Sequence, residues 1–232
     1  MFPPDGPRPL GILMLDTHFP RPLGDVGNPA SWPVPTLLRV VPRLAPRVVV
    51  QTAQGLRAAG VLPAMAEAMR ELEQAGCAAI TTSCGFLVLL QAQLQSAVRV
   101  PVVTSSLLQL PALLAREPQV GVLTISANHL GADHLRAAGV PARRRDDVLV
   151  QGVDPASEFA RAILGDDPAM DLSRAGEGVL QAAGALARRA PGLRTVVLEC
   201  TNMPPYAERI RAETGWQVLS LFDAAGLRMA LH

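Results

Sequence analysis

The sequence contains no lysine, because all 21 of its basic side chains are arginine. A chain without lysine has no amine for a Schiff base with pyridoxal phosphate or with a carbonyl substrate, and it has no P-loop lysine. If the protein acts on amino acids, it must therefore do so without pyridoxal.

Charge imbalance, aromatic residues and long apolar runs are also scarce. The formal net charge is +1 and aromatic residues make up 3% of the chain, so no feature favours nucleic acid, a membrane surface or an aromatic interface. The apolar stretch 107–115 contains Pro111 and is too short to span a bilayer. Residues 1–7 lack the basic and apolar segments of a signal peptide. We therefore expect a soluble, cytoplasmic protein.

Cysteine is rare, and the positions of the three cysteines give most of the evidence for function. An odd number without paired spacing favours free thiols in a reducing compartment over disulfides or a metal site. Cys77 lies inside an apolar run and is expected to pack as a small hydrophobic side chain. His129 and His134 are five residues apart in a predicted helix and do not share a face, so they predict no metal site.

The other two cysteines each follow an apolar run that predicts a buried strand. Cys84 comes after residues 78–82, and Cys200 comes after residues 193–198. A helix is expected to begin just beyond each cysteine, and the free N–H groups of a first helical turn carry partial positive charge. This placement predicts a stabilised thiolate and an anion-binding site at both positions.

The two halves of the sequence also repeat each other. Gly11 and Gly121 lie in similar apolar runs 110 positions apart, and Cys84 and Cys200 are 116 positions apart. Matching landmarks in the same order indicate a duplicated α/β unit. If the halves face each other, the two cysteines meet across one cleft.

The predicted fold class is α/β, with two pseudo-symmetric domains, each a mostly parallel sheet flanked by helices, and the active site in the cleft between them. We assign residues 1–105 and 215–232 to the first domain, which carries Cys84, and residues 106–214 to the second, which carries Cys200. The tail joins the first domain because it repeats the element that closes the first unit. Strands are predicted at residues 10–15, 47–50, 78–82, 98–103, 119–125, 147–153, 195–200 and 217–221. The proline- and glycine-rich segment 19–35 is expected to form a lid or a wall over the cleft.

Two opposed thiols suit proton transfer at a carbon next to a carboxylate. One thiolate removes the proton, and the other thiol returns one on the opposite face, which inverts the centre. Helix termini supply fixed dipoles that hold the carboxylate and the charge that develops on it.

These residues resemble the aspartate/glutamate racemase superfamily, which includes hydantoin racemases, maleate isomerases and arylmalonate decarboxylases. That family carries a Cys-Asn-Thr type motif in its first half and Gly-Cys-Thr-[His/Glu] in its second. Ser83-Cys84-Gly85-Phe86 and Glu199-Cys200-Thr201-Asn202 occupy those places here. The decarboxylases keep a single cysteine, so the presence of both argues against that activity.

The resemblance implies catalytic roles for Cys84 and Cys200, no cofactor and no metal. The candidate substrate-binding residues are Asp16, Thr17, Ser83, Gly85, Phe86, Thr124, Thr201 and Asn202. Asp16 and Thr17 resemble the Asp-Ser pair near the substrate's amino group, although Asp16 also suits a turn cap. Gly85 and Asn202 depart from the family motifs and leave the substrate open. Glu199 is expected to point away from Cys200 if the strand is regular.

The sequence therefore predicts a cofactor-independent racemase or isomerase of a small carboxylate, such as aspartate or glutamate, acting through two cysteines. The alternatives are a maleate-type cis-trans isomerase, a hydantoin racemase, or a non-catalytic protein that binds small carboxylates. Dimers are common in the resembled family, so the resemblance allows a homodimer, but the sequence leaves the oligomeric state open.

Overall fold

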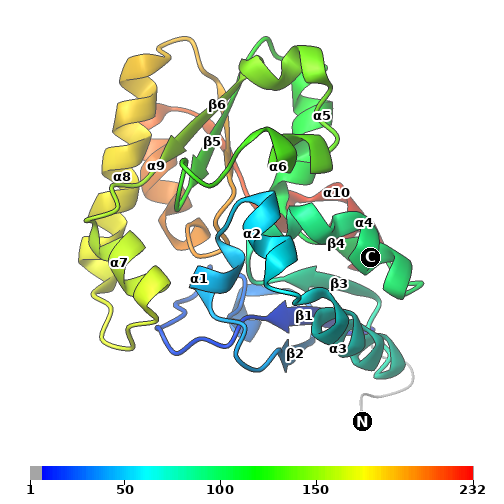
Figure 1. The fold of residues 1–232 in the computed structure, drawn as a ribbon. Coiled ribbons are helices and arrows are strands. Elements are labelled where there is room, and N and C mark those ends of the chain that lie inside the picture. Colours follow the sequence, from blue (N-terminus) through cyan, green and yellow to red (C-terminus); the bar gives the residue numbers. More distant parts are fainter. Residues whose placement is uncertain (1–6, 232) are drawn as a thin grey trace.

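The computed structural model describes residues 7–231; residues 1–6, which carry most of the segment examined for a signal peptide, lie outside them. The described residues form two lobes, each built on a four-stranded parallel sheet (Figure 1). The strand orders are β2-β1-β3-β4 and β6-β5-β7-β8, so each strand of the first sheet has a counterpart in the second. The predicted fold class, two α/β units with mostly parallel sheets, is confirmed.

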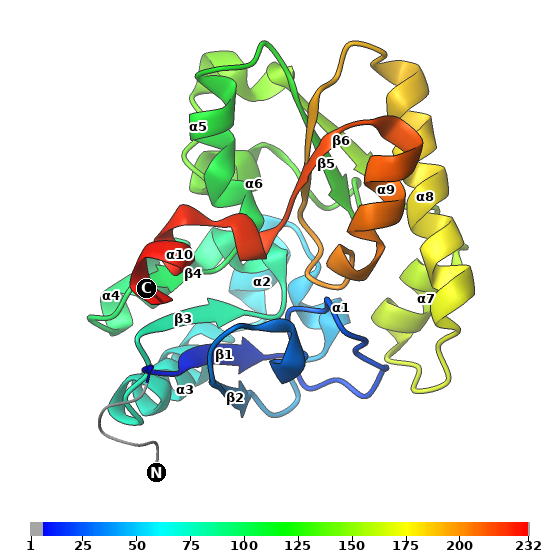
Figure 2. The ribbon, with the colours of Figure 1, turned by 180° about the vertical axis from the view of Figure 1, so that it is seen from behind.

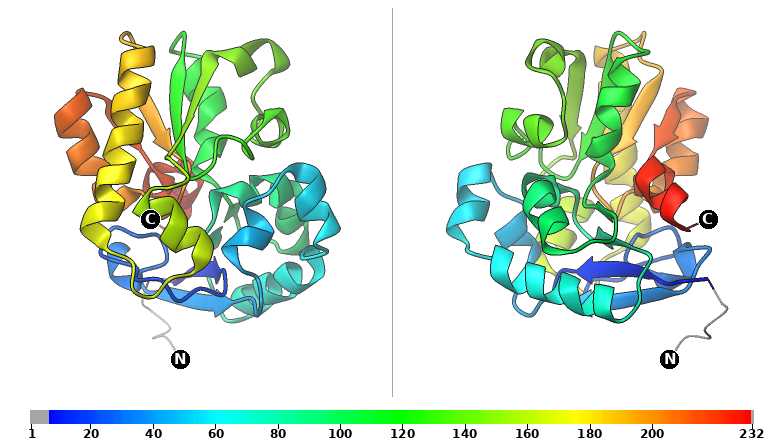
Figure 3. Two further views of the ribbon diagram at one scale, coloured as in Figure 1. Left: turned by 60° about the vertical axis from the view of Figure 1, so that its left-hand side comes forward. Right: turned by 90° about the vertical axis from the view of Figure 1, so that its right-hand side faces the viewer.

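The strands are β1 (Leu10–Met14), β2 (Thr36–Val40), β3 (Ala79–Thr82), β4 (Val102–Val103), β5 (Val120–Thr124), β6 (Val148–Gly152), β7 (Thr195–Leu198) and β8 (Gln217–Leu219). The α-helices are α1 (Pro46–Val49), α2 (Ala53–Ala58), α3 (Leu62–Gln74), α4 (Gln91–Ala97), α5 (Leu110–Leu114), α6 (Ala132–Ala137), α7 (Glu158–Gly165), α8 (Leu172–Arg189), α9 (Ala207–Thr214) and α10 (Ala225–Leu231). Figure 3 shows the two lobes from two further sides.

The central strands are buried throughout because helices cover both faces of each sheet. Every residue of β1 and β5 is buried, as expected for parallel strands with a neighbour on each side. On β5, a Cβ atom at Gly121 would lie 2.7 Å from Leu193 and 3.0 Å from Leu186. The missing side chain therefore lets α8 pack close against the sheet.

The C-terminal segment is shared between the lobes. β8 pairs with β7 in the second sheet, whereas α10 packs against β3 and β4 of the first (Figure 2). The predicted boundary at residue 215 therefore differs from the structure, because β8 is the counterpart of β4 and stays with its own sheet. Only the chain beyond β8 returns to the first lobe, where Leu221 and Leu227 are buried.

The strand predicted at residues 47–50 is wrong, since α1 occupies this region. Pro46 stands at the start of this helical turn, where its fixed φ is favourable and its missing N–H costs nothing. Val49 and Val50 are buried from the helical turn, which overrides the strand preference of the valines. The edge position beside β1 is taken by β2, which lies upstream.

Among residues 7–231, no helix has both the length and the apolar character that crossing a membrane requires.

Candidate active site

The structure brings both strand-end cysteines to one cavity. Cys84 lies two residues beyond β3 and precedes the 3-10 helix Gly85–Leu90, and Cys200 lies two residues beyond β7. The lining atoms surround about 340 Å³ of space, which includes space open to solvent, and leave about 20 Å³ for the centres of water-sized molecules. It is lined by Leu15, Phe19, Arg21, Pro46, Val50, Ser83, Cys84, Gly85, Phe86, Ile125, Ile163, Glu199, Cys200, Thr201 and Asn202.

Buried hydrogen bonds hold the two strand ends together. The Thr201 hydroxyl donates to the Ser83 carbonyl oxygen at 2.6 Å, and each of these residues is a direct neighbour of a cysteine. Behind them, the Ser106 hydroxyl donates to the Leu198 carbonyl oxygen at 2.7 Å. The position of each thiol relative to the other is therefore set by contacts between the lobes.

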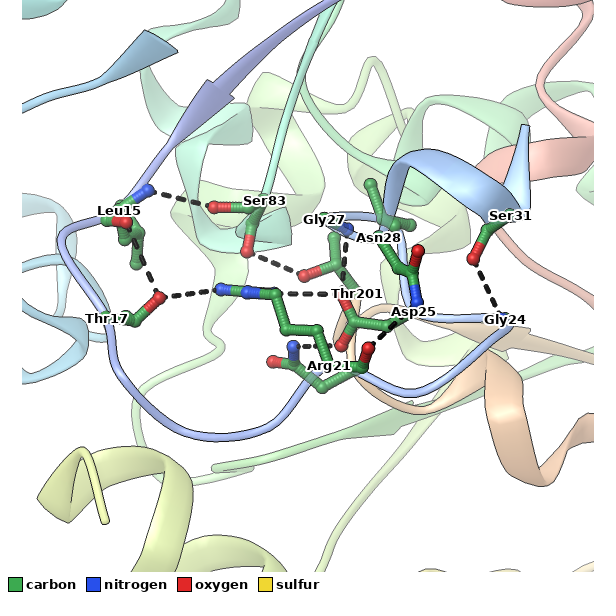
Figure 4. Close-up of polar contacts among 12 residues, drawn as sticks. Leu15, Thr17, Arg21, Gly24, Asp25, Gly27, Asn28, Ser31, Ser83 and Thr201 are labelled. Carbon is green, nitrogen blue, oxygen red and sulfur yellow. Dashed lines mark hydrogen bonds and ion pairs between the residues drawn. The ribbon is translucent and has the colours of Figure 1, made fainter. Parts of the chain in front are cut away.

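The segment that follows β1 forms one wall of the cavity, as its proline and glycine content predicts. Arg21 donates to Asp25 at 2.8 Å and to the Thr17 hydroxyl at 2.9 Å (Figure 4). The Asn202 amide of the second lobe donates to the other oxygen of Asp25 at 2.7 Å. Arg21 also lies over the ring of Phe19, 4.6 Å from its centroid. This network fixes the wall to the second cysteine turn and leaves Arg21 and Asp25 with little net charge.

Burial dominates the electrostatics of the thiols. It raises the pKa of Cys84 to about 12, and negative charge on Glu199 adds to the rise. The pKa of Cys200 is also raised, again chiefly by burial and then by Glu199. The backbone N–H groups of Phe86 and Asn202 lower these two pKa values, as expected for a helix start, but they do not offset burial. The N–H groups of the two turns therefore favour the thiolate in the direction that the sequence predicts, but burial outweighs them.

Glu199 lies in the same cavity and was not expected there. Its side chain is buried, and burial raises the pKa of its carboxyl to about 8 although a hydrogen bond from Thr124 opposes the rise. Regular strand alternation places this side chain away from Cys200, but β7 ends at Leu198, so the alternation does not extend to Glu199.

The predicted site residues divide into two groups. The cavity is lined by Ser83, Cys84, Gly85, Phe86, Cys200, Thr201 and Asn202. Three others do not line it. Asp16 accepts a hydrogen bond from the Arg43 N–H, as a turn cap does, while Thr17 accepts from Arg21 and Thr124 donates to Glu199. The roles assigned to the lining residues stay predictions.

Phe19, Arg21 and Glu199 were missed as site residues. Phe19 and Arg21 belong to the segment expected as a wall, but an irregular loop has no periodicity from which to assign its inward side chains. In the part of the chain that the structure describes, no three His, Cys, Asp or Glu side chains are grouped to hold a metal ion.

Comparisons with known proteins identify relatives over most of the chain. The Asp/Glu/Hydantoin racemase family profile matches residues 34–227. A dimethylsulfoniopropionate lyase of Durusdinium sp. clade D is 29% identical over 96% of this chain and 75% of its own length. Dimethylsulfoniopropionate lyase 3 of Emiliania huxleyi is 31% identical over 93% of this chain, which spans only 56% of that relative. A glutamate racemase structure from Bacillus anthracis has a TM-score of 0.59 at 16% identity, covering 96% of this chain and 80% of its own, and so shows a shared fold.

Replacing Gly85 by alanine is expected to destabilise the protein. The added Cβ atom would overlap the carbonyl oxygen and Oε1 of Glu199, and the carbonyl oxygen cannot rotate away. We expect the free energy of unfolding to fall by about 1–3 kcal/mol, as for other overpacked sites. Urea denaturation measures the change. Gly131→Ala is the control, because a Cβ atom there meets nothing within 4 Å, and equal effects in the two variants contradict the expected clash.

Replacing Asp25 by alanine leaves Arg21 and Asn202 without their buried partner. Loss of one member of a buried ion pair costs about 3–5 kcal/mol, whereas an exposed pair contributes about 1 kcal/mol or less. Asp25→Ala is therefore expected to lower the melting temperature far more than Glu177→Ala, whose side chain is 56% exposed in its pair with Arg209. Similar melting temperatures for both variants in differential scanning calorimetry would show that the Asp25 network is not a structural anchor.

Proposed function

The chain belongs to the Asp/Glu/Hydantoin racemase family, and we propose that it is an enzyme that removes a proton next to the carboxylate of dimethylsulfoniopropionate. The names of its relatives support that substrate. The observation that carries the chemistry is the meeting of two cysteines in one buried cavity.

The proposed reaction is an elimination. A cysteine thiolate takes the proton from the α-carbon, and the electron pair left behind delocalises into the carboxylate. That pair then forms the double bond between the α- and β-carbons as the carbon–sulfur bond breaks. The bonding electrons leave with sulfur, so the products are acrylate, neutral dimethyl sulfide and one proton, which the thiol returns to solvent.

The charge distribution of the cavity fits a substrate that carries its own cation. Arg21 is the sole basic side chain among the lining residues, and Asp25 pairs with it. The buried thiols therefore lack a strong cationic partner, and their pKa values are raised. A bound sulfonium group places positive charge beside them, which lowers the thiol pKa and favours the thiolate when substrate is present.

The contacts of the two thiols favour Cys84 as the base. Cys200 Sγ donates to Asn202 Oδ1 at 3.6 Å, an arrangement that keeps the proton on Cys200. Burial raises the pKa of both thiols, so this contact of Cys200, and not a difference between the two pKa values, distinguishes them. We therefore assign the base to Cys84, and Cys200 stays a neutral hydrogen-bond donor.

A second candidate function is racemisation of a small amino acid. The protonated Cys200 in the same cavity as Cys84 favours it, because inversion requires an acid as well as a base. A racemase exchanges the α-proton with solvent deuterium and keeps the carbon skeleton intact, whereas the lyase releases dimethyl sulfide.

Removal of the Cys84 thiol is expected to abolish most turnover. Loss of a general base slows a reaction by about 10²–10⁴-fold, so Cys84→Ala should release dimethyl sulfide that much more slowly, and Cys200→Ala should show a smaller loss. Gas chromatography of the headspace above purified protein and dimethylsulfoniopropionate measures release. Cys77→Ala is the matched control, because Cys77 is buried outside the cavity and should keep wild-type turnover.

If the wild-type protein releases no dimethyl sulfide and instead exchanges the α-proton of aspartate or glutamate for deuterium, that result would contradict the lyase activity and favour the racemase activity. Full activity of Cys84→Ala would remove Cys84 from the role of base.

A further inference from the structure

Glu199 lines the cavity and has a buried oxygen without a hydrogen-bond partner, which the thiol chemistry does not use. Oε2 accepts a hydrogen bond from the Thr124 hydroxyl at 2.7 Å, whereas Oε1 is buried and has no hydrogen-bond partner among residues 7–231. A buried polar atom without a partner is costly, and such atoms are few in folded proteins. Oε1 is therefore free to form a hydrogen bond with a bound ligand.

The position of Oε1 explains the glycine that follows Cys84. A side chain at position 85 would overlap Oε1 as well as the Glu199 carbonyl oxygen. Position 85 is where related racemases carry the asparagine of their Cys-Asn-Thr motif. The carboxyl group of Glu199 therefore occupies space beside the Cys84 turn that another side chain would otherwise fill.

We propose that Glu199 is a catalytic hydrogen-bond donor, which binds the substrate carboxylate as a neutral acid through Oε1–H and stabilises the charge that collects there when the α-proton leaves. This inference rests on the proposed function. In this arrangement the substrate carboxylate lies on the side of the cavity that Gly85 forms, and Cys84 remains the base.

The surroundings of Glu199 keep the acid neutral at physiological pH. Burial raises its pKa to about 8, and the hydrogen bond from Thr124 lowers it only in part. The titratable groups that face it are the Cys84 and Cys200 thiols, whose pKa values rise when Glu199 is ionised. Arg21 and Asp25 line or flank the same cavity but pair with each other. A neutral carboxylic acid in an apolar site is an effective donor to a developing enolate.

The sign of the pH dependence follows from this arrangement. As pH rises through about 8, Glu199 loses the proton that it donates, repels the substrate carboxylate and opposes ionisation of the thiols. Turnover by the wild-type protein is therefore expected to fall on the alkaline side.

The central test compares Glu199→Gln with Glu199→Ala. Since Thr124 donates to the side-chain oxygen, the glutamine NH₂ is directed to the place of Oε1 and remains a donor at every pH. Glu199→Gln should keep measurable turnover and lose the alkaline fall, whereas Glu199→Ala should lose about 10²–10³-fold in kcat, as when an oxyanion donor is removed. A purely structural role would leave the alkaline fall in place in Glu199→Gln.

The variant Thr124→Val tests the same role independently, because it changes the pKa of Glu199 without replacing Glu199 itself. Removal of the Thr124 hydroxyl takes away the hydrogen bond that lowers the Glu199 pKa, so the alkaline fall should move to higher pH. Glu177→Gln, an exposed carboxylate on α8, is the matched control and should keep the wild-type profile. An alkaline fall that is unchanged in Glu199→Gln and Thr124→Val would overturn the proposal.

Binding of propionate, which cannot react, separates this inference from the proposed function. Calorimetric titration should show that propionate binds the wild-type protein more weakly as pH rises through about 8, and that Glu199→Gln lacks this dependence. If the wild-type protein releases no dimethyl sulfide but shows this binding profile, the lyase assignment fails and the role of Glu199 stands. If dimethyl sulfide is released and propionate binding is equally independent of pH in both proteins, the role of Glu199 fails.

Discussion

One buried hydrogen bond, from the Thr201 hydroxyl to the Ser83 carbonyl oxygen, joins the two strand-end turns that carry the cysteines of the site. Each partner is the neighbour of a cysteine at the end of a strand, and the two strands belong to different sheets. Apolar central strands fix where each turn emerges, and this contact fixes one turn against the other. The shared cavity thus follows from a duplicated fold whose halves meet at equivalent strand ends.

Low polarity is the second property that shapes the chemistry. A thiol buried without a strong cation keeps its proton, and a carboxyl group beside it does the same. The side chains that line the cavity therefore carry little net charge. In the proposed reaction, a zwitterionic substrate would supply both a cation that favours the thiolate and an anion for a neutral donor. Burial, which disfavours a thiolate, would then make formation of the base depend on substrate binding.

The sequence predicts those features that depend on local pattern. Continuous apolar runs locate the central strands, and polar residues after them locate Cys84 and Cys200. Features that depend on tertiary contacts were not predictable. Residues 47–50 form a helical turn because the edge of the sheet is already occupied, and Asp16 is drawn to a turn by the Arg43 N–H. Glu199 enters the cavity because β7 ends at Leu198, two residues before the end of the predicted strand, so regular alternation does not reach Glu199 and Cys200.

The most direct test of a cavity thiol acting as a base uses dimethylsulfoniopropionate with deuterium at both α positions. The account predicts acrylate that keeps one deuterium, dimethyl sulfide in equal amount, and an unchanged protein mass. Dimethyl sulfide released while both deuterium atoms remain on a carbon chain bonded to a cysteine would contradict it, because the sulfur would then have attacked the β-carbon instead of the α-proton.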